Sequence, residues 1–190
     1  MNNNYHERKI FREIHEPGAN FSNREFEQCK FENCDLSDVN FSHSKLTDCT
    51  FVNCNLSMIK LQNAALKTVD FKQCKLSGVD FSECHDFIFE VGFSNTILDF
   101  STFTKLDMKY TKFRDCHIHD ANFTRCNLES AIFKNCDLKG ATFEHTNLVK
   151  CHLSTSYNFM INPNNNNVWK AVFSISGLPG LLLQYGIIVE

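Results

Sequence analysis

The chain has little net charge and lacks the long apolar runs that membrane proteins require. Its 22 acidic and 19 basic residues leave a formal net charge of −3, so it offers neither a strongly basic field for nucleic acid nor a strongly acidic one. No apolar stretch reaches the roughly 18 residues that a membrane-spanning helix needs. The first residues, MNNNYHERK, contain no apolar segment typical of a secretion signal. We therefore expect a cytoplasmic protein with no membrane contact and no direct nucleic-acid contact.

The sequence also lacks the motifs that usually indicate chemistry. It contains no Gly-rich phosphate loop, no G-x-S-x-G and no H-E-x-x-H. His117 and His119 flank Ile118 and could hold a metal, but a solvated pair is the favoured interpretation. We expect no catalytic residue, no metal and no cofactor, and hence no enzyme.

A large apolar residue returns at every fifth position in two long blocks. The first block runs from Phe21 to Phe81 and the second from Phe93 to Leu153, and neither block misses a position. Two residues before each of these positions lies a second position, which usually holds a small residue. A period of five matches neither an α-helix at 3.6 nor a strand at 2.0. A fixed repeat of such short units indicates a solenoid instead.

Several five-residue units share one consensus: a small residue, Asp or Asn, Leu or Phe, then two polar residues. The clearest are CDLSD (34–38), CNLSM (54–58), ANFTR (121–125), CNLES (126–130) and CDLKG (136–140). In these units the chain resembles the pentapeptide repeat proteins. The resemblance implies an all-β fold, a right-handed quadrilateral β-helix with one unit per face and twenty residues per coil. A filled solenoid of this kind has no concave pocket for catalysis.

The ten cysteines are numerous enough for a disulfide framework or a metal site, but their positions favour neither. Nearly all fall on the small position of a unit, and Cys84 has the same phase just before the interruption between the blocks. The sequence has no C-x-x-C pair, and a reducing cytoplasm favours free thiols. We therefore expect all ten side chains to point inward as small buried residues.

The interruption between the two blocks has the sequence SECHDFIFEVG (82–92). Phe81 and Phe93 are twelve residues apart, which is two units plus two residues. A two-residue bulge would therefore keep Phe93 on the face of Phe71. The β-helix is expected to run without a break through residues 19–155.

The same interruption contains candidate residues for contact with a partner. Phe87, Ile88 and Phe89 compete for one inward position, so at least one aromatic side chain is expected near the surface. The insertion either repacks on its own face or presents Phe87 and Phe89 to a partner, since loops carry function more often than scaffolds do.

Residues 1–18 lack the period and are expected to form an N-terminal cap. Ile10, Phe11 and Ile14 suit a short strand that covers the first coil. Without such a cover the solenoid would expose apolar side chains and unpaired strand edges.

Residues 156–190 are expected to form a loop, a last rung and a C-terminal dimerisation segment. The Asn-rich stretch 156–167 is the loop, and 171–173 resumes the repeat as a rung on the face of Leu153. A short helix follows, with Pro179 near its start. One coil end cannot bury all the apolar residues of this segment, so a homodimer is expected there. The expected interface residues are Leu178, Leu181, Leu182, Leu183, Tyr185, Ile187 and Ile188.

Within the pentapeptide repeat family, the chain is most similar to the quinolone-resistance group, the Qnr and MfpA proteins. The similarity lies in the continuous coils, the mid-rod interruption and the apolar ending LLLQYGIIVE. It implies a non-enzymatic DNA mimic that binds a type II topoisomerase, DNA gyrase or topoisomerase IV, and gives quinolone resistance or toxin immunity. The alternative is an interaction scaffold with a different protein partner. The candidate partner-binding acids on the face of Leu36 are Asp35, Asp38, Asp99, Asp120 and Asp137.

Overall fold

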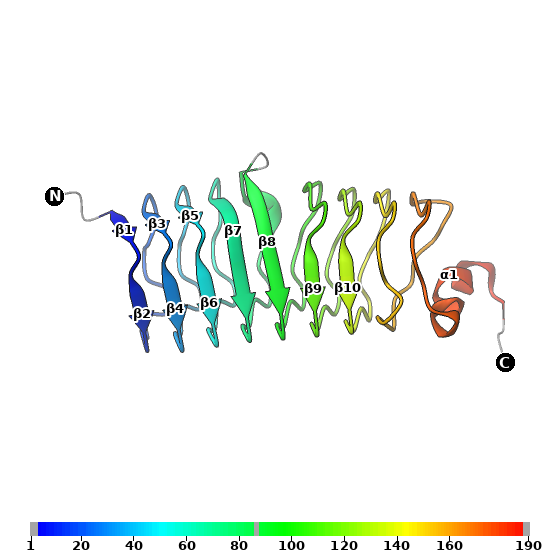
Figure 1. Cartoon of the computed structure of the whole chain (residues 1–190), viewed down its shortest axis with the longest axis horizontal. Coiled ribbons are helices and arrows are strands. Elements are labelled where there is room, and N and C mark those ends of the chain that lie inside the picture. The colour runs from blue at the N-terminus through cyan, green and yellow to red at the C-terminus, as the bar shows by residue number, and fades with distance from the viewer. Residues whose placement is uncertain (1–3, 86–87, 188–190) are drawn as a thin grey trace.

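The computed structural model describes residues 4–85 and 88–187 of the chain. Figure 1 shows a single rod in which the chain winds coil after coil from one end to the other. The strands are β1 (Tyr5–Glu7), β2 (Ile10–Arg12), β3 (Glu25–Glu27), β4 (Lys30–Glu32), β5 (Lys45–Thr47), β6 (Thr50–Val52), β7 (Ala65–Lys72), β8 (Phe89–Ser94), β9 (Lys112–Arg114) and β10 (Ile132–Lys134). The helical elements are the 3-10 turns η1 (Phe81–Glu83), η2 (Ile175–Gly177) and η3 (Leu183–Tyr185) and the α-helix α1 (Pro179–Leu182). Within the described ranges, no helix has the length and hydropathy to cross a membrane.

Successive coils lie in parallel register, twenty residues apart. Phe31 pairs with Phe51, and Phe51 pairs with Phe71. Most units end in a corner where the backbone adopts a positive φ, such as 55° at Asn33 and 52° at Asn53. Asn and Asp tolerate this left-handed conformation better than most residues, which explains the polar end of the repeat. The fold is the right-handed quadrilateral β-helix that the sequence predicts.

Two side chains of each unit point into the coil and form one continuous core. Phenylalanine rings stack from coil to coil: the centroids of Phe31 and Phe51 are 4.5 Å apart with planes 7° from parallel. Phe113 and Phe133 repeat this geometry at 4.5 Å and 5°. Leucines occupy the alternate faces, where Leu36 has no exposed surface. Each such side chain contributes roughly 1.5–3 kcal/mol through burial, so the repeat itself accounts for the core.

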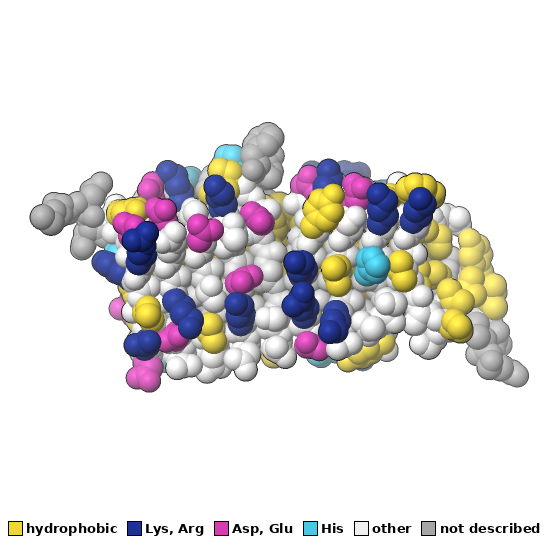
Figure 2. Space-filling view, in the orientation of Figure 1, with side chains coloured by type: hydrophobic (Ala, Val, Ile, Leu, Met, Phe, Trp, Pro, Cys, Tyr) yellow, Lys and Arg dark blue, Asp and Glu magenta, His cyan; other side chains and the backbone are white. Residues whose placement is uncertain are grey.

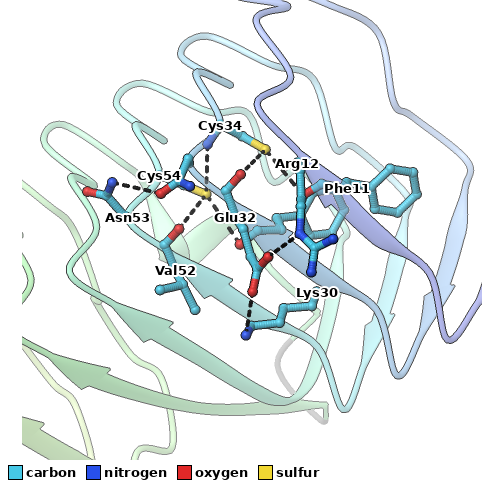
Figure 3. A network of polar contacts seen from close by, with 10 residues as sticks. Phe11, Arg12, Lys30, Glu32, Cys34, Val52, Asn53 and Cys54 are labelled. Atoms are coloured by element: carbon cyan, nitrogen blue, oxygen red, sulfur yellow. Dashed lines mark hydrogen bonds and ion pairs between the residues drawn. The ribbon is translucent and has the colours of Figure 1, made fainter.

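All ten cysteines are free and buried, as the position of each in its unit predicts. Cys54 Sγ lies 3.5 Å from the carbonyl oxygen of Phe31 and 3.3 Å from that of Val52, and the N–H of Cys34 points to it at 3.4 Å (Figure 3). Ser44 occupies the same position in another unit, and its hydroxyl donates to a carbonyl of the preceding coil at 2.7 Å. Where Cys or Ser fills this position, its side chain can therefore also hydrogen-bond to a carbonyl of the preceding coil, whereas Ala64 and Ala121 fill it by size alone.

The two extra residues of the interruption are accommodated by a shift in the pairing of β7 with β8. The two strands pair in parallel, but their register shifts between Leu66 and Val69. Leu66 lies opposite Phe89, whereas Phe71 lies opposite Phe93. The coils after the insertion keep the phase of the coils before it, which confirms the predicted two-residue bulge.

The N-terminal residues already follow the coil, so the coiled path starts before residue 19. His6 pairs with Phe26 and Phe11 with Phe31, in the same twenty-residue register as the coils that follow. The ring of Phe11 stacks on Phe31 at 4.7 Å, and β2 is the strand expected to cover the first coil. The sequence pattern missed this coil because its first inward position holds a histidine instead of an apolar residue.

Charged side chains reinforce that first contact on the outer surface. Arg12 Nε donates to Glu32 Oε2 at 2.6 Å, and Lys30 Nζ lies 2.5 Å from Glu32 Oε1 (Figure 3). Hydrogen bonds from Lys30 and Arg12 hold the pKa of Glu32 below its ordinary value. Exposed pairs of this kind add little stability, so the stacked rings are the main attachment.

The stretch 156–167 is not the loop that the sequence predicts, because it continues the coil. Tyr157 is bridged to Asp137, and Asn167 to Asn147. Both bridges keep the twenty-residue register of the repeat. The Asn-rich composition therefore conceals one further coil.

Asn166 is the physical reason why this polar stretch can coil. Its Nδ2 donates to the Phe143 carbonyl at 2.8 Å, and its Oδ1 accepts the N–H of Thr146 at 2.8 Å. Asn166 thus makes the bonds that Cys or Ser makes at this inward position elsewhere. Ile161 fills the inward position one unit earlier and is 1% exposed.

A compact helical segment closes the last coil. The predicted rung is present, since the N–H of Leu153 donates to the Val172 carbonyl at 2.8 Å. Beyond it, Gly180 approaches Phe159 so closely that a Cβ there would collide with the phenylalanine backbone and ring. The N–H of Ile161 donates to the Gly180 carbonyl at 3.0 Å. The inner side of this segment therefore covers the end of the core.

Candidate partner-binding surfaces

The five predicted acidic residues lie along one face, but they do not form a continuous acidic stripe. Asp35 and Asp137 belong to one column of bridged residues. The residues between them are Asn55, Lys75, Ile97 and His117. Asp38 and Asp120 belong to the adjoining corner column. The residues between these two are Met58, Gly78 and Phe100.

Part of this acidic charge is satisfied within the rod. Asp35 Oδ2 lies 3.4 Å from His15 Nδ1, and its Oδ1 accepts the hydroxyl and N–H of Ser37 at 2.8 and 3.2 Å. The bonds from Ser37 hold the pKa of Asp35 below its ordinary value. Asp38 Oδ1 lies 3.2 Å from Lys60 Nζ. Asp35 therefore supports its own turn, and Asp38 has a nearby cation.

Asp99 and Asp137 meet around the two histidines that flank Ile118. His117 Nδ1 lies 2.7 Å from Asp99 Oδ1, which also accepts the N–H of His119 at 2.9 Å. His119 Nε2 lies 2.9 Å from Asp137 Oδ2, and the two imidazole centroids are 3.5 Å apart. The expected solvated histidine pair is instead a partly buried group with two carboxylates. We call these four residues the histidine cluster.

One of the two aromatic candidates at the interruption, Phe87, lies outside the described residues. Phe89 is half-buried, and its ring meets that of Phe81 edge-on with the centroids 6.0 Å apart. Ile88 is 41% exposed. Phe89 therefore fills the contested inward position, and Ile88 faces the solvent.

An open groove of about 660 Å³ borders Phe89 on the face that carries β7, β8 and β9. Its charged lining residues are Asp70, Lys72, Glu90, Lys109, Lys112 and Arg114. Figure 2 shows this face of the rod, on which Lys and Arg side chains are interspersed with Asp and Glu side chains. The groove carries more positive than negative charge. Sequence reasoning did not find it because its side chains come from different coils.

The three most exposed aromatic side chains of the described residues were not singled out by sequence reasoning. Phe100 is 65% exposed, Tyr110 67% and Trp169 58%. Each occupies an outward position of its unit that is usually polar. That departure from the repeat is the signal that could have found them, and Tyr110 also lines the groove.

A comparison of the sequence with models of known protein families identifies the family of this chain. A sequence model of the pentapeptide repeat region matches residues 24–86 and 88–157, more than half of the chain. The chain belongs to the pentapeptide repeat family. A comparison of this pentapeptide repeat protein with curated proteins gave no significant match.

Among solved structures, this pentapeptide repeat protein is similar to a trypsin-treated form of QnrB1, described as a plasmid-mediated fluoroquinolone resistance protein. The two are 20% identical with a TM-score of 0.65, over 98% of this chain and 91% of the other. HetL, a pentapeptide repeat protein involved in heterocyst differentiation regulation from the cyanobacterium Nostoc, is 16% identical with a TM-score of 0.44, over 88% and 86% of the two chains. The likeness to QnrB1 shows a common fold, and the likeness to HetL is too low to carry an argument.

The predicted dimer residues of this pentapeptide repeat protein divide into an inner and an outer set. Leu181 and Leu182 are half-buried, and Leu181 packs against the core. The exposed members are Leu178 at 46%, Leu183 at 48%, Tyr185 at 55% and Ile187 at 50%. Ile188 lies outside the described residues. Figure 2 shows hydrophobic side chains gathered at this end of the rod.

The predicted site of this pentapeptide repeat protein is therefore spread over several places. Asp99 and Asp137 come together in the histidine cluster, and Asp120 lies at the corner beside it. Asp35 and Asp38 lie several coils nearer the N-terminus. A partner that touched all five would have to lie along the rod.

Proposed function

We propose that this pentapeptide repeat protein is a non-enzymatic ligand of a type II topoisomerase, DNA gyrase or topoisomerase IV, and binds it in place of duplex DNA. Binding there would protect the enzyme from a quinolone or a toxin. The observation that carries the proposal is the shape, an unbroken coil from β1 to the last rung at Val172. The fold similarity to QnrB1, a fluoroquinolone resistance protein, supports it.

The dimensions of the rod suit a ligand that lies along an extended surface. At about 4.8 Å per coil, the coils from Tyr5 to Phe173 span roughly 40 Å. Duplex DNA carries one charge per about 1.7 Å of its axis, whereas this surface mixes both signs. Binding would therefore depend on shape and on a few exposed carboxylates. Asp38 and Asp120, both exposed at one corner, are the best placed.

We propose in addition that two chains pair through their C-terminal segments. The inner side of the segment packs on its own coil, while Leu183 and Ile187 remain about half exposed at 48% and 50%. Ile175, at the start of the segment, is 89% exposed. A second copy of the same patch covers these side chains by two-fold symmetry and doubles the length of the rod.

The groove beside β8 favours a second candidate function, that of a scaffold for a different protein. Its excess of positive charge and its exposed Tyr110 suit an acidic segment of a partner. A DNA mimic has no use for a basic groove, so the two candidates place the binding surface on different faces.

Competition binding tests the first proposal. Purified gyrase would be immobilised, and binding of the native protein would be measured with and without duplex DNA at fixed ionic strength. We expect direct binding that DNA displaces and that weakens as salt rises. Binding that DNA leaves unchanged would favour the scaffold candidate, and no binding to gyrase or topoisomerase IV would contradict the proposal.

A further inference from the structure

The histidine cluster departs from the repeat at a position that normally supports the turn. In other units an Asp or Asn there accepts the N–H two residues later, as Asn55 does from Ser57 at 3.2 Å. His117 stands at this position instead. The N–H of His119 donates to Asp99 of the preceding coil at 2.9 Å. Because His117 replaces the usual Asp or Asn, the acceptor of this N–H is Asp99, whose carboxylate is thereby held beside the two imidazole rings.

We propose that Asp99, His117 and His119 bind a divalent transition-metal ion of the zinc type. Each residue offers one ligand atom, and these atoms lie within 4.8 Å of one another. Bonds of about 2.0–2.2 Å in a tetrahedral site place the ligand atoms about 3.3–3.6 Å apart. Small side-chain rotations therefore suffice to complete the site, because the backbones are already held in adjacent coils.

The donor atoms select the class of metal. Imidazole nitrogen combined with carboxylate oxygen suits Zn²⁺ and its neighbours Cu²⁺ and Ni²⁺, whereas Ca²⁺ and Mg²⁺ prefer oxygen ligands alone. Three protein ligands leave a fourth position for water or for a group from a partner. The fourth member of the cluster, Asp137, places its Oδ2 2.9 Å from His119 Nε2. A carboxylate orients a metal-binding histidine through the ring nitrogen that does not bind the metal, so with Asp137 in this role His119 would bind the ion through Nδ1.

The ion would join two coils just after the interruption. Asp99 lies one coil before His117 and His119, in a part of the rod where the register has been reset by the bulge. An unfolded chain does not hold these three groups together, so binding would favour the folded rod.

Metal binding to the full-length chain, without a polyhistidine tag and with its thiols kept reduced, tests the proposal. Zn²⁺ would be titrated calorimetrically after removal of bound metal, and Co²⁺ would be followed by visible absorption. We expect one ion per chain and a melting temperature raised by roughly 5 °C or more at a hundredfold excess over Kd.

Two variants and a matched control make the result specific. His117→Asn restores the residue found at Asn55, and His119→Ser restores the one at Ser57, so both should fold. Each is expected to weaken Zn²⁺ binding at least about tenfold. The control is His152→Asn, at the same position of its unit but bridged to Ile132 and Val172, and it should bind as the native chain does.

Three outcomes would overturn the inference. One is no Zn²⁺ binding by the native chain, and another is equal binding by His117→Asn and the native chain. The third is a Co²⁺ spectrum with thiolate charge-transfer bands, which would assign the metal to the cysteines.

Discussion

Phe93 stacks on Phe71 with ring centroids 5.4 Å apart and planes 11° from parallel, although 22 residues separate them where other coils have twenty. The ladder continues to Phe113 at 5.2 Å and 12°. The two additional residues are absorbed before Phe93, in the segment where Phe89 lies opposite Leu66. The core is therefore continuous across the interruption, and its continuity depends on which side chain fills the inward position there.

If Phe89 fills the inward position at the interruption and Ile88 does not, the two residues should differ in their contribution to stability. Phe89→Ala should lower the free energy of unfolding by about 2 kcal/mol, because it removes the contact with Phe81 and leaves a cavity. Ile88→Ala should change it by less than about 0.5 kcal/mol, because Ile88 faces the solvent. Urea unfolding followed by circular dichroism measures both variants. Equal losses, or a larger loss at Ile88, would contradict the assignment of the inward side chain.

The cysteines should be unreactive in the folded rod. Burial raises the pKa of Cys49, Cys126 and Cys151 to about 12. At pH 8 these thiols are therefore neutral, whereas an exposed thiol, with a pKa near 8.5, is partly ionised. A thiol-specific reagent at pH 8 should label the native chain very slowly and all ten cysteines after denaturation. At Cys49, Cys126 and Cys151 the native rate should stay low until the pH nears the raised pKa. Rapid labelling of several native thiols at pH 8 would show that the small positions are not closed.

Periodicity made the coils predictable because it is a local physical requirement. Every inward position must be filled, so a residue such as Leu56 or Cys54 reveals its place by its spacing alone. The ends were less predictable, since His6 and Asn166 are polar side chains in inward positions. Asn166 is tolerated only because its amide meets a carbonyl and an N–H of the preceding coil. No composition rule anticipates that match.

The histidine cluster was only half visible in the sequence. The spacing of His117 and His119 places both on the outside of one unit, which the structure confirms. Their contact with Asp99 depends on how side chains reach across neighbouring coils once the bulge has reset the register. The spacing of a sequence gives the position of each residue in its coil. It does not give the direction in which an outward side chain points toward the neighbouring coil.

Disruption of the C-terminal patch should give a monomer with an intact rod. Leu183→Glu combined with Ile187→Lys places charges on exposed side chains, so the packing of Leu181 on the core is preserved. Light scattering coupled to size exclusion should show a dimer for the native chain and a monomer for the variant. The control Met58→Glu changes a side chain that is 60% exposed elsewhere on the rod and should remain dimeric. A native monomer would rule out the interface.

Charge reversal at one corner tests the proposed topoisomerase-binding face. Asp38→Lys with Asp120→Lys should weaken gyrase binding at least about tenfold, because steering and contact are both lost. Lysine fits these corners, since Lys105 and Lys150 adopt the same left-handed backbone at φ 66° and 55°. The control Asp115→Lys, at the equivalent corner of another face, should bind as the native chain does. Wild-type affinity in the double variant would disprove the face assignment.

The supercoiling activity of purified DNA gyrase tests the proposed function most directly. Gyrase would be assayed over a range of fluoroquinolone concentrations, with and without the native protein, and with the Asp38→Lys and Asp120→Lys double variant as a control. We predict that the native protein shifts the concentration of drug needed for half-inhibition, or inhibits supercoiling by itself, and that the double variant does so less. The proposed function is contradicted if supercoiling by gyrase is the same with and without the protein at every drug concentration, and if the activity of topoisomerase IV is likewise unchanged. The rod would then not act on a type II topoisomerase.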